Sequence, residues 1–187
     1  MSRAPRLAPH ELSGAESELY TLFTTGTRAR PGSDFSLVDA SGQLIGPPAS
    51  WMMSAELGLA LERVGREIRF NLALPARSRE IVILMVAEAE DSDFERYAHK
   101  RAATRAGLSA EEIDSLSRSQ FVPHNAHESV LIEMAQVLIA GDSLSDHLWE
   151  RAVAEFSLRG SFEIVTLIGY YRLIALQLRA FDILPPM

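Results

Sequence analysis

The most informative absence from this chain of 187 residues is cysteine, of which there is none. Disulfides, thiolate catalysis and cysteine-ligated metals are therefore all excluded. A chain without cysteine fits a reducing compartment. The N-terminal stretch MSRAPRLAPHELSGAES contains arginines but no apolar segment of the kind found in signal peptides. We therefore expect a cytoplasmic protein.

Long apolar runs and an excess of basic residues are also missing. The longest candidate span, Phe162 to Leu178, is interrupted by Glu163, Arg172 and Gln177, whereas a bilayer needs about 18–20 apolar residues in succession. The formal net charge is −7, and binding to nucleic acid needs a basic footprint. We expect a protein with neither a membrane nor a nucleic-acid partner.

Strand patterns are scarce and helical periodicity dominates, which predicts an all-α fold, a compact bundle of about seven to eight helices. Residues 1–50 would supply an N-terminal helix and a loop rich in glycine and proline, and residues 51–187 the main helical domain, within one globular unit. The expected helices are Pro9–Thr24, Trp51–Phe70, Leu74–Ala89, Asp93–Ala106, 109–118, Ala126–Ala140, Ser145–Phe156 and Ser161–Phe181.

Local patterns refine this arrangement. Residues 81–87 are apolar on all sides, so their helix should be the buried one. In the helix 51–70, Leu57, Leu61, Val64 and Ile68 recur at helical spacing and should face the core. Residues 35–38 and 43–45 are suited to a short hairpin.

Four polar residues around the centre of the chain form the candidate site: Glu80, Ser92, Glu95 and His99. Glu95 and His99 are four residues apart and project from one helix face. Because the link after the helix of Glu80 is short, the two helices should be antiparallel neighbours, which brings Glu80 to the level of His99. A carboxylate beside an imidazole orients it and raises its pKa, and such a pair can act as a general acid–base relay.

Each of these residues also has a structural explanation. Ser92-x-x-Glu95 has the pattern of a capping box, in which the two residues satisfy the first N–H groups of a helix. Glu80 borders a buried helix and needs a partner, which could be His99 or an arginine such as Arg77 or Arg79. His124, His127, Glu128 and His147 lack the spacing of a metal site, and we expect no bound metal.

Several segments, in order, resemble the carboxymuconolactone decarboxylase and alkylhydroperoxidase D-like family. They are GPPASWMMSAELG (46–58), LPARSRE (74–80), YAH (97–99) with AGLSAEEI (106–113), and FEIVTLIGYY (162–171). The resemblance implies an all-α fold that assembles into trimers or hexamers, with active sites around the helix pair that carries the four polar residues. In the redox branch of the family, cysteines occupy the places held here by Ser92 and Glu95. Thiol peroxidase activity is therefore not expected, since a serine cannot form a disulfide.

The resemblance leaves open a lyase-like reaction that uses no cofactor. A small carboxylic acid or lactone would bind beside the helix pair and lose CO2. His99, oriented by Glu80, would then protonate the product carbanion, with Glu95 as the alternative acid. Arg77 and Arg101, with Ser92, are the candidate substrate-binding residues. Two alternatives remain: a non-catalytic ligand-binding or scaffold protein, and an isomerase or hydrolase that uses the same acid–base residues.

Overall fold

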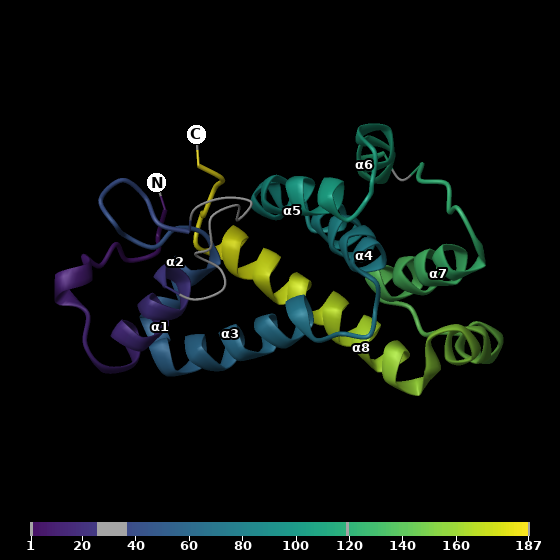
Figure 1. Cartoon of the computed structure of the whole chain (residues 1–187), viewed down its shortest axis with the longest axis horizontal. Helices are drawn as coiled ribbons and strands as arrows, with labels where there is room; N and C mark the ends of the chain where they lie inside the picture. Colours follow the sequence, from purple (N-terminus) through teal and green to yellow (C-terminus); the bar gives the residue numbers. More distant parts are fainter. Residues whose placement is uncertain (1, 26–36, 119, 187) are drawn as a thin grey trace.

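The computed structural model describes residues 2–25, 37–118 and 120–186, and these residues form the expected all-α fold (Figure 1). The described residues contain one element of β-structure, an antiparallel bridge between Val38 and Leu44. It lies where the hairpin of residues 35–38 and 43–45 was expected, although residues 35 and 36 are not among the described residues. The helices are η1 (Pro9–Glu11), α1 (Gly14–Thr24), α2 (Pro47–Trp51), η3 (Met52–Ser54), α3 (Ala55–Phe70), α4 (Ala76–Ala89), α5 (Asp93–Arg105), α6 (Ala110–Ser117), α7 (Ala126–Ala140) and α8 (Asp146–Ala180).

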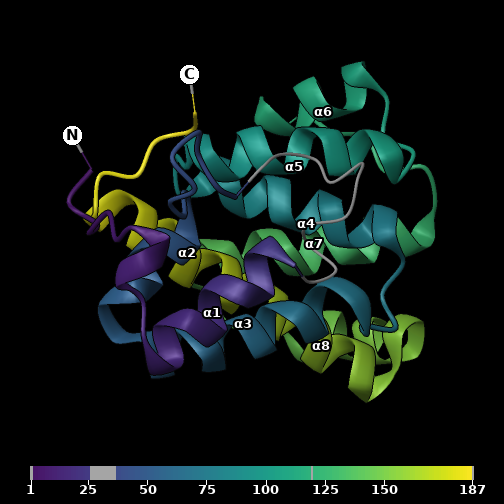
Figure 2. The same ribbon diagram turned by 60° about the vertical axis from the view of Figure 1, so that its left-hand side comes forward.

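Helix α4 lies at the centre, as its uniformly apolar sequence predicts. It packs against α5, α6, α7 and α8, and its residues Ile81, Val82 and Ile83 are almost completely buried. Figure 2 shows α5 beside α4, with α6 outside them. Burial on several sides leaves little freedom to this helix, so a polar residue on it is held in a fixed position.

Helix α8 spans the last two predicted helices, 145–156 and 161–181. The break predicted between them is present as a kink at Ser157, whose φ of 64° and ψ of 171° are non-helical. Gly160, three residues later, is helical, and a Cβ there would lie 2.9 Å from the Cβ of Phe156. The glycine therefore allows close packing beside the kink.

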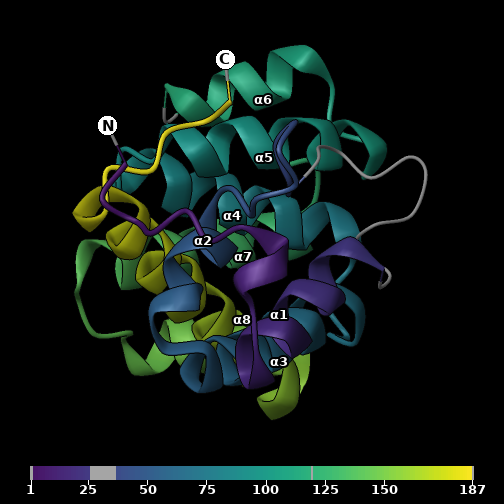
Figure 3. The same cartoon turned by 90° about the vertical axis from the view of Figure 1, so that its left-hand side faces the viewer.

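The N-terminal segment packs onto the same body. The expected helix 9–24 is divided at Ser13 into η1 and α1. Leu19 and Phe23 of α1 share a core cluster with Trp51, Phe94 and residues of the end of α8. The backbone N–H of Arg3 also donates to the carbonyl of Phe181 at 2.8 Å, and Figures 1 and 3 show the purple N-terminal segment passing beside the yellow end of α8.

The predicted apolar face of α3 is correct only in part. Ile68 is buried, but Leu57 and Val64 are exposed, while Gly58 and Gly65 face inward. A Cβ on Gly58 would lie 2.9 Å from a methyl of Leu19. Helix α1 therefore approaches α3 closely at Gly58, and Leu57 and Val64 are turned away from the core. Within the described residues, no helix has the length and apolarity to cross a membrane.

Candidate active site

The antiparallel pairing of α4 and α5 brings Glu80 and His99 together, as the short link predicts. The Nδ1 of His99 lies 2.7 Å from Oε2 of Glu80. The link after α4 is tight because the N–H of Ser92 donates to the carbonyl of Ala87 at 2.8 Å. Glu80 also lies 3.4 Å from Nε of Arg79, so the carboxylate has both an imidazole and a guanidinium partner.

A second carboxylate holds the other side of the imidazole. The Nε2 of His99 lies 3.4 Å from Oε2 of Glu95, one turn earlier on α5. All three residues are buried: Glu80 and Glu95 are each 4% exposed and His99 is 7% exposed. The ring of Tyr171 from α8 packs edge-on against the imidazole, with the centroids 5.0 Å apart. His99 is thus fixed from two helices and shielded by a third.

The two carboxylates decide the charge of His99. Burial disfavours the imidazolium, but the charge of Glu80, its hydrogen bond and the contact with Glu95 outweigh burial and raise the pKa of His99 to about 9. Burial likewise opposes ionisation of Glu80, yet the charge and hydrogen bond of His99 keep the pKa of that carboxyl below its ordinary value. At neutral pH, therefore, His99 is protonated and can act as an acid.

Ser92 and Glu95 do not form the predicted capping box. Ser92 is the N-cap residue of α5 by its backbone, but its side chain caps no N–H, and its Oγ is buried without a partner. Helix α6 does have such a box, with Ser109 and Glu112 bonded in both directions. The difference lies in the neighbours, because the carboxylate of Glu95 meets the charged imidazole of His99 instead of the helix N-terminus.

A small cavity of about 40 Å³ lies beside this cluster. Glu95 and His99 line it, whereas Glu80 lies behind the imidazole, outside the lining. The other lining residues come from the segment before α2 and from α2, α3, α5 and α8: Leu37, Pro47, Pro48, Trp51, Arg69, Phe94, Ala98, Tyr170, Tyr171 and Ile174. The cavity is therefore largely apolar, with its charged groups on α3 and α5.

Gly46 allows the proline segment to form part of this wall. Its φ is +71°, in the left-handed region, and a Cβ there would lie 2.4 Å from the ring of Phe94. Glycine is the residue that meets both requirements without strain. Pro47 and Pro48, which follow it, can then pack against α5 at the cavity.

Two residues of the cavity were not found from the sequence: Arg69 on α3 and Tyr171 on α8. Burial raises the pKa of the Tyr171 phenol well above its ordinary value, so this group remains protonated at neutral pH. Arg69 has its Nε buried without a partner among the described residues. No local pattern identifies either residue, since both lie on helices far in sequence from α5.

The predicted substrate-binding arginines are not brought to the cavity. Arg77 is bound to Glu128 through Nε at 2.7 Å and also to Glu112, and it donates to the carbonyl of Gly107 at 2.9 Å. It therefore joins α4 to α6 and α7. Arg101 is exposed on α5. Of the sequence-derived residues, the structure gathers Glu80, Glu95 and His99, with Ser92 at the start of the same helix.

A second histidine, His127, forms a separate chain of hydrogen bonds. The Nε2 of His127 lies 3.1 Å from Oγ of Ser78, and its Nδ1 lies 2.9 Å from Oε1 of Glu155. A serine–histidine–carboxylate chain resembles a hydrolase triad, but Ser78 is only 3% exposed. The chain instead ties α4 to α7 and α8. Within the described ranges, no group of three histidine or carboxylate residues is arranged to hold a metal ion.

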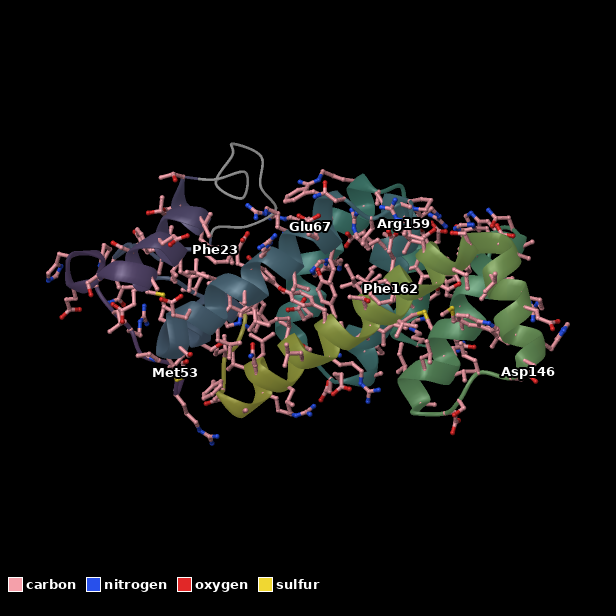
Figure 4. The ribbon with its side chains drawn as sticks, turned by 90° about the horizontal axis from the view of Figure 1, so that it is seen from below. Phe23, Met53, Glu67, Asp146, Arg159 and Phe162 are labelled. Carbon is pink, nitrogen blue, oxygen red and sulfur yellow. The ribbon has the colours of Figure 1, made fainter. Side chains whose placement is uncertain are left out.

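Larger hollows of about 490 Å³ lie elsewhere on the molecule. One, between α4, α6 and α7, is lined by residues such as Met85, Phe121 and Ile132. The other lies between α3 and α8, and Figure 4 shows Glu67, Arg159 and Phe162, which line it. Neither hollow is lined by a buried carboxylate–imidazole pair, whereas the smaller cavity is.

Fold and site together define an all-α protein of the alkylhydroperoxidase D-like class, built around a buried carboxylate–imidazole–carboxylate cluster. Residues 55–129 match the model of the Carboxymuconolactone decarboxylase family. The resemblance predicted from the sequence is thereby confirmed: the segment that contains Glu80, Ser92, Glu95 and His99 matches that family, in a chain that has no cysteine.

Solved structures share the fold over nearly the whole chain. A cysteine-to-alanine variant of the debrominase Bmp8 in complex with 2,3,4-tribromopyrrole is 12% identical, with a TM-score of 0.71 over 100% of this chain and 94% of that one. The apo form of Bmp8 is 15% identical, with a TM-score of 0.70 over 94% and 90% of the two chains. At these identities the likeness shows a common fold alone. A comparison with curated proteins finds no matching relative.

Proposed function

We propose that this protein is an acid–base enzyme that removes CO2 from a small carboxylated lactone or a related acid, without a cofactor. The observation that carries the proposal is the buried imidazole of His99, held between Glu80 and Glu95 at the edge of a cavity, where the two carboxylates raise its pKa to about 9. Such an imidazole is a placed proton donor. The family of residues 55–129 supports the same reaction class, and the lack of cysteine excludes its thiol chemistry.

The proposed reaction assigns a separate task to each residue. The bond between the ring and the carboxylate breaks, CO2 leaves, and the electron pair passes into the conjugated lactone carbonyl. His99 then gives its Nε2 proton to the carbon and is reprotonated from water. Glu80 holds Nδ1 and keeps the ring in place, which makes it a positioning residue. Glu95, which also lines the cavity, is placed to accept or return the Nε2 proton.

The ligand class fits the cavity wall. Trp51, Phe94 and Tyr170 supply flat apolar surface, which suits a planar unsaturated ring. The Bmp8 structure that shares this fold was solved with 2,3,4-tribromopyrrole, which is a small planar ring. That ligand supports a small planar ring as the substrate of this protein. Apolar walls also favour loss of CO2, because they withdraw water from the leaving carboxylate.

Turnover of a panel of small carboxylated lactones, followed by CO2 release, tests the proposal. We expect His99→Gln to lower kcat by about 10²–10⁴-fold, the usual contribution of general acid catalysis. In D2O the product should carry one solvent deuterium at the protonated carbon. His147→Gln, an exposed histidine on α8, is the matched control and should retain full activity.

The result that would overturn the proposal is turnover in His99→Gln equal to that of the parent, with both proteins folded by circular dichroism. Glu80→Gln separates positioning from direct catalysis, because it should shift the pH profile of kcat as well as lower it. Unchanged profiles in Glu80→Gln would exclude the positioning role.

A non-catalytic scaffold is the second candidate, and two observations favour it. His99 is 7% exposed, and Glu80 is also in contact with Arg79 at 3.4 Å, as expected for a purely structural ion cluster. In that case the parent protein would turn over none of the panel, and the main effect of His99→Gln would be a loss of stability.

A further inference from the structure

Arg69 has a buried hydrogen-bond donor at the edge of the cavity. It lies in the last turn of α3, is only partly exposed and lines the same cavity as Glu95 and His99. Its Nε is buried, yet no acceptor within the described residues receives the N–H. A buried N–H without an acceptor is destabilising. A ligand that brings a hydrogen-bond acceptor into the cavity would pair with the Nε–H of Arg69 and remove this cost.

The size of the cavity limits that acceptor to a small group. A water molecule needs roughly 10–15 Å³ on this measure, so about 40 Å³ holds about three water-sized centres. Three centres match a carboxylate group or one edge of a small ring. The indole of Trp51 is held by a hydrogen bond from Nε1 to Gln177 at 2.9 Å, so this wall is fixed and favours a planar ligand.

The charges around the cavity favour an anion at Arg69. The negative charges of Glu80 and Glu95 are offset by the imidazolium of His99 and by the guanidinium of Arg79, which lies 3.4 Å from Glu80. Arg69 is close enough for its charge to act on both Glu80 and Tyr171. No ion pair within the described residues joins its guanidinium to a carboxylate. Its positive charge therefore makes the cavity receptive to a negatively charged oxygen.

We propose that Arg69 is the anion-binding residue of this cavity, and that it receives the negatively charged oxygen of a small planar oxyanion, an enolate or a carboxylate. The inference builds on the proposed function, because the lactone carbonyl gains negative charge as CO2 leaves. A donor aimed at that oxygen stabilises the transition state. Pairing with the departing carboxylate would instead stabilise the ground state and slow the reaction.

Binding of paired anionic and neutral probes tests this role without relying on turnover. Tetronate, an enolised lactone anion, is compared with neutral 2(5H)-furanone, and 2-furoate is compared with neutral 2-furamide. Isothermal titration is carried out on the parent protein, Arg69→Gln, Arg69→Lys and Arg66→Gln. Arg66 lies exposed on the same helix and provides the matched control.

We expect the parent to bind an anion at least tenfold more tightly than its neutral partner, as for a hydrogen bond to a charged group. Arg69→Gln should lose this preference, Arg69→Lys should keep part of it, and Arg66→Gln should be unchanged. A preference for tetronate would assign the enolate role to Arg69, and a preference for 2-furoate alone would assign it carboxylate binding. Equal affinity for anions and neutral analogues, or an undiminished preference in folded Arg69→Gln, would overturn the proposal.

The two proposals can fail separately. His99→Gln should lose turnover and still bind the anionic probe through Arg69. If the parent shows no turnover but binds anions in an Arg69-dependent way, the decarboxylase proposal fails and the anion site stands. If turnover depends on His99 while Arg69→Gln retains the full anion preference, the anion-site proposal fails and the decarboxylase proposal stands.

Discussion

The pair of Glu80 and His99 should make the stability of the protein depend on pH in a predictable direction. Folding raises the pKa of His99 from 6.5 to about 9. A group whose pKa is raised by folding contributes stability that is fully present below its unfolded pKa. The contribution is then lost as the pH rises through the folded value. We therefore expect the free energy of unfolding to fall between about pH 6.5 and pH 9.

The size of this loss follows from the shift. Each pKa unit corresponds to about 1.36 kcal/mol, so a shift from 6.5 to about 9 corresponds to about 3 kcal/mol. His99 is buried, so solvent screening does not reduce the value as it would at the surface. Replacement of Glu80 by glutamine preserves the shape and an acceptor for Nδ1–H but removes the charge. The pH-dependent loss should therefore shrink in Glu80→Gln.

Urea unfolding at a series of pH values measures the loss, and histidine NMR measures its origin. The chain has five histidines, so the resonance of His99 can be assigned from its absence in His99→Gln. In the parent it should titrate near pH 9, and in Glu80→Gln at a lower pH. A parent resonance that titrates at or below 6.5, or the same pH slope of stability in both proteins, would refute the reasoning.

Two further predictions rest on matched pairs in urea unfolding. Ser109→Ala should destabilise the protein by about 1 kcal/mol, because it removes a helix cap. Ser92→Ala should be neutral or stabilising, because its buried hydroxyl has no partner; a larger loss in Ser92→Ala would restore the capping explanation. Gly46→Ala should destabilise by roughly 1–3 kcal/mol more than Gly107→Ala. Both glycines have positive φ, but only at Gly46 would a Cβ meet Phe94, so equal losses would show that this contact is unimportant.

Local patterns in the sequence were sufficient to predict most of the helices and the contact between Glu80 and His99. The apolar residues 81–87 predicted the buried helix α4, and the observed burial of Ile81, Val82 and Ile83 confirms it. The short link between α4 and α5 predicted that Glu80 meets His99, and their separation of 2.7 Å confirms it. These inferences hold because helix periodicity and a tight turn fix which residues of two neighbouring helices lie at the same level.

The choice among competing partners needed the tertiary structure. Glu95 fits a capping box and a site equally well by spacing, and only the position of the imidazole directs it to His99. Arg77 was a reasonable anion-binding candidate, but the carboxylates of α6 and α7 engage it, whereas Arg69 reaches the cavity from α3.

The sequence by itself thus determined an all-α chain without thiol chemistry and placed Glu80 at the level of His99 on the neighbouring helix. The tertiary structure decided which further side chains surround that pair, among them Arg69 and Tyr171 on helices distant in the chain. The physical reason is the range of the interactions. Periodicity and turn length act over a few residues, whereas the charge of a buried imidazole and the lining of a cavity depend on side chains from several helices packed together.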